Sequence, residues 1–189
     1  NAVQLEGLVE QDTTLYANVN YLLDNTLVIR GATLTIKPGA TITFGYNEVT
    51  GTNGDIKFYD HNGVSGRMLA LGTKDSIITF QKDTYFTGGS LENLEFNHTD
   101  NGSSWDLDDD GNILFDPTVN TQASYCDFCH FNEIGTSGLS MRNTLFDGGR
   151  EYYGNGFFNK STFTGYGWGT QMLGNVKHYF SNVVDYYTG

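Results

Sequence analysis

Short apolar segments recur along the chain, and each of them ends at a residue that is typical of turns. The first clear set covers residues 27–29, 34–36 and 42–44. The second and third segments alternate apolar, polar, apolar, as a strand does when one of its faces is buried. The connections between the three segments are too short for crossover helices. The pattern therefore predicts an all-β fold in which the chain either meanders or coils.

A repeat centred on phenylalanine favours a coil over a meander. Segments of similar pattern align on Phe80, Phe96, Phe128, Phe146, Phe163 and Phe180. Apart from one gap of 32 residues, the spacings are 16 to 18 residues. A period of about 17 residues is shorter than the common helical repeats and suits one turn of a β-solenoid. Each of these Phe side chains is then expected to stack on the next and fill the interior.

The long gap in the repeat indicates an insertion into an otherwise regular coil. Residues 99–117 are polar and hold the densest acidic cluster, so we expect them to form a loop inserted into a single domain of residues 1–189. Residues 1–20 are expected to form an N-terminal cap or an assembly segment. Residues 183–189 form neither a helix nor a charged block. This end predicts either a fragment of a longer protein or end-to-end assembly of copies into a fibre.

Two segments also resemble a known class of proteins. The sequence GATLTIKPGATITF at residues 31–44 is similar to the opening turns of secreted right-handed parallel β-helix proteins. The sequence GRMLALGTKDSIITF at residues 66–80 resembles the next characteristic turn, although members often carry Pro where Ile77 stands. The resemblance implies a right-handed parallel β-helix and an extracellular or cell-surface location. The family includes adhesins, surface-fibre modules and polysaccharide lyases, so it does not assign a chemistry.

Composition excludes two classes of partner. The chain carries 22 acidic and 10 basic residues, which leaves a formal net charge of −12. Nucleic-acid binding needs a basic surface, and no such surface is visible in the sequence. No apolar run approaches the roughly 18 residues of a membrane-spanning helix, so we expect no membrane span.

The inserted segment carries the strongest metal-binding pattern. Asp106, Asp108 and Asp110 alternate and are followed by Gly111, as in loops that wrap Ca²⁺ with several oxygens. Further oxygens are expected from the backbone of Asn112 and from Asp116. The pattern departs from an EF-hand because Pro117 stands at its twelfth position. We expect a calcium loop that stabilises the insertion, and the alternative is a solvated acidic loop without a specific ion.

Cys126, Cys129 and His130 form a C-x-x-C-H sequence, the attachment pattern of c-type haem. Two thioethers would tether the porphyrin, and the imidazole would bind iron. If Phe128 points inward, however, strand alternation turns Cys126 and His130 inward and Cys129 outward. Cys126 is then a small buried residue, and the two thiols lie too far apart for a disulfide. Structural cysteines are the favoured interpretation, and a mono-haem electron-transfer protein is the alternative.

Aromatic residues are frequent in the last forty residues. Tyr166 and Trp168 are flanked by glycines, so we expect them in a turn, where their rings would suit a sugar or a protein partner. The basic residues near the repeats do not form the constellation that a polysaccharide lyase needs. The sequence therefore predicts a calcium-stabilised structural or adhesive module that binds itself, neighbouring domains or a polysaccharide. A polysaccharide lyase and the haem protein are the alternatives.

Overall fold

The computed structural model describes residues 1–83, 93–97, 124–132, 134, 136–137, 139–147, 151–153, 156–159, 161–166, 171–173, 176–179 and 182–186. Within these ranges the protein consists of strands and turns, and no helix occurs. The expectation of an all-β fold is therefore confirmed. The strands are short, because each apolar segment is soon followed by a Gly, Asn or Asp residue that lets the chain turn.

The strands form three parallel sheets, which we call sheets A, B and C. Sheet A has eight strands: β1 (Val3–Gln4), β4 (Asn20–Leu23), β7 (Thr41–Phe44), β12 (Ile78–Lys82), β15 (Cys129–Asn132), β18 (Leu145–Asp147), β21 (Thr162–Tyr166) and β24 (Asn182–Tyr186). Sheet B has seven: β2 (Gly7–Val9), β5 (Thr26–Arg30), β10 (Asp55–Tyr59), β13 (Leu94–Asn97), β16 (Thr136–Ser137), β19 (Glu151–Tyr153) and β22 (Gln171–Leu173). Sheet C has seven: β3 (Thr13–Leu15), β6 (Thr33–Ile36), β11 (Arg67–Leu71), β14 (Tyr125–Asp127), β17 (Ser140–Arg142), β20 (Gly156–Asn159) and β23 (Val176–Tyr179).

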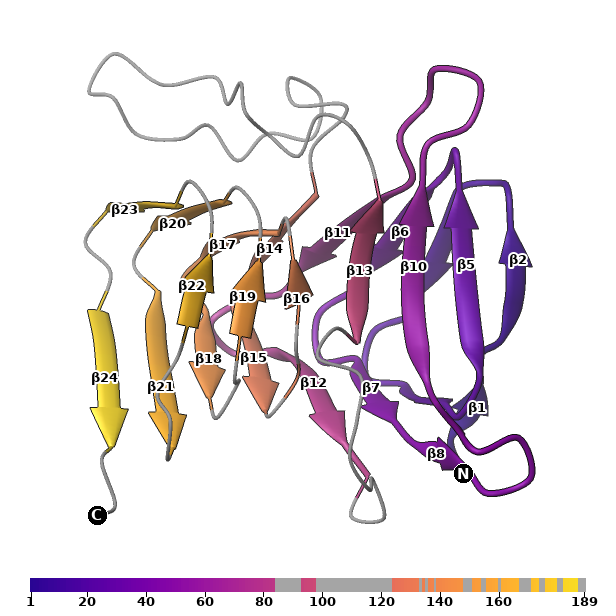
Figure 1. Ribbon diagram of the computed structural model, residues 1–189, viewed down its shortest axis with the longest axis horizontal. Helices are drawn as coiled ribbons and strands as arrows, with labels where there is room; N and C mark the ends of the chain where they lie inside the picture. Colours follow the sequence, from indigo (N-terminus) through magenta and orange to yellow (C-terminus); the bar gives the residue numbers. More distant parts are fainter. Residues whose placement is uncertain are drawn as a thin grey trace.

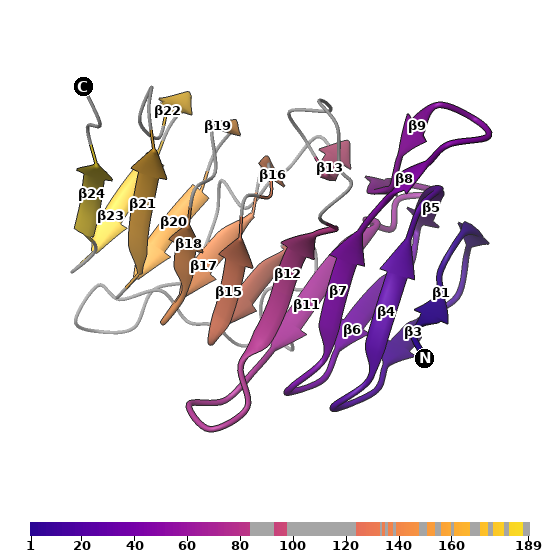
Figure 2. The same ribbon diagram turned by 90° about the horizontal axis from the view of Figure 1, so that it is seen from below.

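The chain visits the three sheets in strict rotation. It passes from sheet A to B to C and returns to A, so each strand pairs with the strand one turn earlier and the strand one turn later. One antiparallel hairpin, β8 (Tyr46–Asn47) with β9 (Thr52–Asn53), interrupts the rotation between β7 and β10. The turns stack along the long axis, with the two termini at opposite ends (Figure 1). Figure 2 shows the strands of sheet A side by side along this axis. This arrangement is compatible with a β-solenoid.

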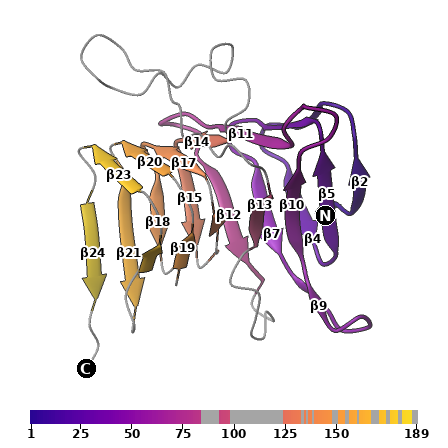
Figure 3. The ribbon, with the colours of Figure 1, turned by 45° about the horizontal axis from the view of Figure 1, so that its top comes forward.

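All three sheets contribute to one apolar core. Phe80 of sheet A, Phe58 of sheet B and Met68 of sheet C are fully buried in the same cluster. In Figure 3 the strands of the three sheets are seen around the space that these side chains fill. The segments expected from the sequence at residues 27–29, 34–36 and 42–44 lie within β5, β6 and β7. Their apolar residues point into the core, and the residues between them are partly exposed.

The phenylalanine repeat is correct in kind but wrong in its assignments. Phe80 stacks on Phe131 within sheet A, whereas Phe96 belongs to sheet B and stacks on Phe58. Phe128 joins neither stack, because it lies in the corner between β14 and β15. The turn length also varies. Register partners are 15 residues apart from 131 to 146, 17 from 146 to 163 and 20 from 163 to 183.

Two expected segments have different outcomes. Residues 1–20 contribute β1, β2 and β3, the first strand of each sheet, and these pair with β4, β5 and β6. A role as a cap or an assembly segment stays a prediction. The expected insertion at 99–117 lies outside the described residues, between the end of β13 and the start of β14.

Candidate functional site

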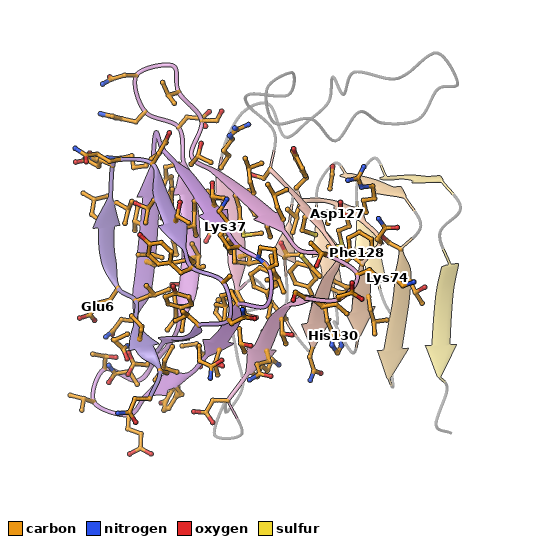
Figure 4. All side chains as sticks on the ribbon, turned by 180° about the vertical axis from the view of Figure 1, so that it is seen from behind. Glu6, Lys37, Lys74, Asp127, Phe128 and His130 are labelled. Atoms are coloured by element: carbon orange, nitrogen blue, oxygen red, sulfur yellow. The ribbon has the colours of Figure 1, made fainter. Side chains whose placement is uncertain are left out.

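The corner between β14 and β15 brings both cysteines into the core. Cys126 is 0% exposed and Cys129 is 2% exposed. Between them Phe128 adopts a left-handed backbone conformation with φ of 49°, which breaks the strand alternation. The expectation that Cys129 points outward is therefore wrong, and so is the inward position of Phe128 and His130. Figure 4 shows Asp127 and Phe128 at this corner and His130 beyond it on β15.

The two thiols share one set of neighbours. The Cys126 sulfur lies 3.7 Å from the Thr144 hydroxyl, and the same hydroxyl accepts a hydrogen bond from the Cys129 backbone N–H at 3.4 Å. The Cys129 thiol also forms a hydrogen bond with Cys126. Burial raises the pKa of the Cys129 thiol well above its usual range, and the hydrogen bond with Cys126 and the charge of Asp127 add to this effect. Cys129 is therefore a neutral thiol at ordinary pH.

A polar cluster fixes the outer side of the same corner. The Asp127 carboxylate forms an ion pair with Arg142 of β17 and accepts a hydrogen bond from the Asn143 side-chain amide at 2.9 Å. The Asp127 backbone oxygen accepts the Gly72 N–H at 2.9 Å, and the Arg142 backbone oxygen accepts the Phe128 N–H at 3.1 Å. These contacts tie three successive turns together. They hold the corner in the one conformation that buries both cysteines.

His130 lies on the opposite side of β15 from the thiols. It pairs in register with Thr79 and Leu145, both of which are partly exposed, whereas its neighbours Cys129 and Phe131 are buried. The two sulfurs and the imidazole therefore do not converge on one centre in this conformation. Haem attachment stays a prediction, and an intact mass tests it directly.

The outer face of sheet A carries two rows of partly exposed, mostly uncharged side chains. One row runs Asn20, Thr41, Thr79, His130, Leu145, Thr162, and the other runs Leu22, Thr43, Gln81, Asn132. The rows are linked across strands, since the Gln81 side-chain amide donates to the Thr43 hydroxyl at 3.2 Å. Adjacent strands repeat these groups at roughly 4.8 Å. The face therefore presents a regular array of hydroxyl and amide groups.

Sheet C does not offer a comparable face at its centre. Leu69 and Tyr125 occupy the register positions opposite the core on β11 and β14, yet they are only 5% and 0% exposed. Both faces of these strands are thus buried, which explains the continuous apolar run around Leu69. A ligand has direct access to sheet A but not to this part of sheet C.

The remaining predicted sites are only partly within the described ranges. The proposed calcium ligands Asp106, Asp108, Asp110, Asn112 and Asp116 lie outside them, as does Trp168. Tyr166 is the last residue of β21 and pairs with Tyr186, so its backbone belongs to a strand rather than to a turn. Among the residues that the structure does describe, no group of three or more His, Cys, Asp or Glu side chains is arranged to hold a metal ion.

Two features were missed by the sequence interpretation: the shared burial of the cysteines and the Asp127 cluster. Asn143 carried the signal for both. It occupies the position of Phe128 one turn later, and it too has a left-handed backbone, with φ of 48°. Asn favours that conformation, so aligning Phe131 with Phe146 would have marked Phe128 as a corner residue.

No family model, curated protein or solved structure matches this chain. In the described part of the chain, there is also no helix with the length and apolar character needed to cross a membrane.

Proposed function

We propose that the chain is a right-handed parallel β-helix that serves as an extracellular structural or adhesive module rather than as an enzyme. The observation that carries this proposal is the strict rotation of strands through three sheets around one apolar core. Such a coil is stiff along its axis, because every turn contacts only its neighbours and adds the same length. A rod of this kind holds or spaces other molecules, and its function does not require a catalytic pocket.

Small-angle X-ray scattering tests the rod directly. We expect a maximum dimension and a cross-section that match an elongated coil, and far-ultraviolet circular dichroism of a β protein. A scattering profile of a compact sphere would contradict the proposal. Assays for reducing-end release and for unsaturated products from anionic polysaccharides test the lyase alternative, and we expect no activity in either.

We further propose that adhesion uses the outer face of sheet A, with a polysaccharide as the partner. The rows of hydroxyl and amide groups on this face repeat at the spacing of the strands, and uncharged groups of this kind form hydrogen bonds with sugar hydroxyls. The test is binding of neutral and anionic polysaccharides by isothermal titration calorimetry. Thr43→Glu with Gln81→Glu should weaken binding at least about tenfold. Thr26→Glu, at an exposed position of sheet B, is the matched control and should leave binding unchanged.

The outermost turns of the described sheets support self-association. Strands β1, β2 and β3 each pair on one side only, and Val3 and Leu8 are about half exposed there. Unpaired edges of parallel strands are templates for another strand. We propose that a second copy, or a neighbouring domain of a longer chain, adds to this edge.

Sedimentation velocity over a range of concentrations tests the edge. We expect association that Leu8→Lys weakens, because a charged lysine on an edge strand opposes pairing. Val49→Lys is the matched control, since Val49 is 95% exposed in the turn of the β8–β9 hairpin, away from this edge. A monomer at every concentration would contradict assembly from copies of this chain.

We also propose that Ca²⁺ stabilises the module through Asp106, Asp108, Asp110, Asn112 and Asp116. Alternating carboxylates before a glycine are the support for this proposal. A chelator should lower the melting temperature, and added Ca²⁺ should restore it. Asp108→Asn should abolish this response, while Asp75→Asn, in the loop before β12, should leave it intact. An unchanged melting curve on chelation would contradict the calcium assignment.

A further inference from the structure

We propose that Cys126 and Cys129 form an intramolecular disulfide bond that closes the corner between β14 and β15. This inference concerns a covalent modification and does not depend on what the rod binds. Only the oxidising surroundings that favour the bond rest on the proposed extracellular location. The bond would link the end of a strand of sheet C to the start of a strand of sheet A.

The geometry of the corner places the two sulfurs together. Along a regular strand, residues three apart point to opposite faces, which would keep the thiols out of bonding distance. Here the left-handed Phe128 reverses the chain, and both cysteines enter the core beside Thr144. The thiols already form a hydrogen bond with each other. A C-x-x-C sequence around a tight turn is also a spacing at which disulfides form.

Loss of the thiol hydrogens costs this corner little hydrogen bonding. The Cys129 thiol donates to the backbone oxygens of Asp127 and Ala70, at 3.5 and 3.8 Å, which are long and weak bonds. The Asp127 oxygen has a better donor in the Gly72 N–H at 2.9 Å. Oxidation therefore leaves that oxygen paired.

A metal site is the other chemistry that two adjacent thiols suggest, and the structure favours the disulfide over it. A thiolate-bound metal such as Zn²⁺ takes four ligands in its structural sites. His130, the nearest candidate in sequence, lies on the other side of β15. No cluster of three metal-binding side chains occurs among the described residues.

The oxidant is a small-molecule disulfide such as oxidised glutathione. One cysteine thiolate attacks a sulfur of this disulfide, forms a mixed disulfide and releases one glutathione thiolate. The second cysteine thiolate then attacks the protein sulfur, forms the Cys126–Cys129 bond and releases the second glutathione thiolate. The protein thus loses two protons and two electrons, and the oxidant becomes two thiols.

Burial determines when this exchange can occur. Exchange needs a thiolate with access to the oxidant, and both sulfurs are buried beneath the corner in the folded protein. We therefore place the reaction before the turn that contains Thr144 stacks on the corner. The folded reduced protein should oxidise at least about tenfold more slowly than the chain in urea.

The experiment compares the full chain produced in an oxidising bacterial periplasm with the same chain produced in a reducing cytoplasm. Both samples are unfolded in urea with iodoacetamide, and the alkylated thiols are counted by intact mass. We expect none in the periplasmic sample, two after it is treated with a reductant, and two in the cytoplasmic sample. The oxidised protein should melt roughly 3–6 °C higher than the reduced protein.

Three results would overturn the proposal. They are two free thiols in the periplasmic protein, a mass increased by glutathione, and a dimer that reductant dissolves on a gel. Cys126→Ala and Cys129→Ala single variants serve as controls, because each keeps one thiol and should be alkylated once in both samples. Their thiol count is taken in urea, so it does not depend on whether they fold.

Discussion

The ring of Phe131 lies flat on the ring of Phe80 one turn earlier, with centroids 4.6 Å apart and an interplanar angle of 0°. This separation is close to the distance between neighbouring strands, because the two residues are register partners in parallel strands of one sheet. Phe146 continues the row one turn later, tilted by 36° at 5.7 Å. The interior is therefore built from rows of like side chains, and each row repeats with the strands.

Removing a ring from the middle of this row should destabilise the protein strongly. Phe131→Ala deletes a fully buried ring with a neighbour on each side, so we expect a loss of about 3–5 kcal/mol in the free energy of unfolding. Phe131→Leu keeps most of the volume and should cost clearly less. Urea unfolding measures both. Tyr16→Ala, at a side chain that is 69% exposed, is the control and should change stability by less than about 0.5 kcal/mol.

Two neighbouring glycines at the base of the β8–β9 hairpin should respond very differently to alanine. A Cβ on Gly54 would lie 1.9 Å from the Leu23 backbone oxygen, whereas one on Gly45 would meet only the tip of Leu22 at 3.3 Å. The first clash is with backbone and cannot be relieved by a rotamer change. We expect Gly54→Ala to lower the midpoint of urea unfolding markedly, and Gly45→Ala to have a small effect. Equal midpoints for the two variants would contradict the close approach of these turns.

Strand positions could be predicted from the sequence better than strand partners. Alternation of apolar and polar residues identified β6 and β7, because one face of each strand meets the core. Phe96 was placed in the wrong row, because a coil with three sides has a row of apolar side chains on each sheet. Residue type alone cannot tell these rows apart. The hairpin at one corner also changes the spacing, and a single period does not allow for it.

The ion pair at the corner should contribute more than an exposed ion pair. The Asp127 side chain is 11% exposed and accepts bonds from Arg142 and Asn143, so Asp127→Ala should cost about 2–3 kcal/mol. Glu10 and Arg30 form a comparable pair, but both side chains are more than one third exposed. Glu10→Ala should therefore cost less than about 1 kcal/mol. Thermal and urea unfolding of both variants give the comparison, and similar losses would show that burial does not strengthen the corner pair.

The candidate site was harder to predict than the fold, because one backbone angle decides it. Strand alternation, which is correct for β15, fails at Phe128, since its φ of 49° turns the chain. That conformation depends on contacts with other turns, among them the bond from its N–H to the Arg142 oxygen. Such contacts appear only once the turns are stacked. The sequence therefore identified the cysteines as notable but assigned Cys129 to the wrong side.

The raised pKa of Cys129 predicts a loss of stability at alkaline pH in the reduced protein. An unfolded thiol ionises near pH 8.5, whereas in the folded protein burial keeps Cys129 neutral to higher pH. The folded state therefore binds the proton more tightly than the unfolded state. This contribution to stability is complete below about pH 8 and is lost as the pH rises through the folded pKa.

The free energy of unfolding of the reduced protein should thus fall between about pH 8.5 and 10, by at most roughly 1.4 kcal/mol per pH unit from this group. Urea unfolding at several pH values in the presence of a reductant measures the slope. Cys129→Ala provides the comparison, because other groups titrate equally in both proteins and only the Cys129 contribution disappears. The oxidised protein should also lack it, since a disulfide has no proton to lose. The same slope in the reduced protein and in Cys129→Ala would mean that the thiol is ionised as easily in the core as in water.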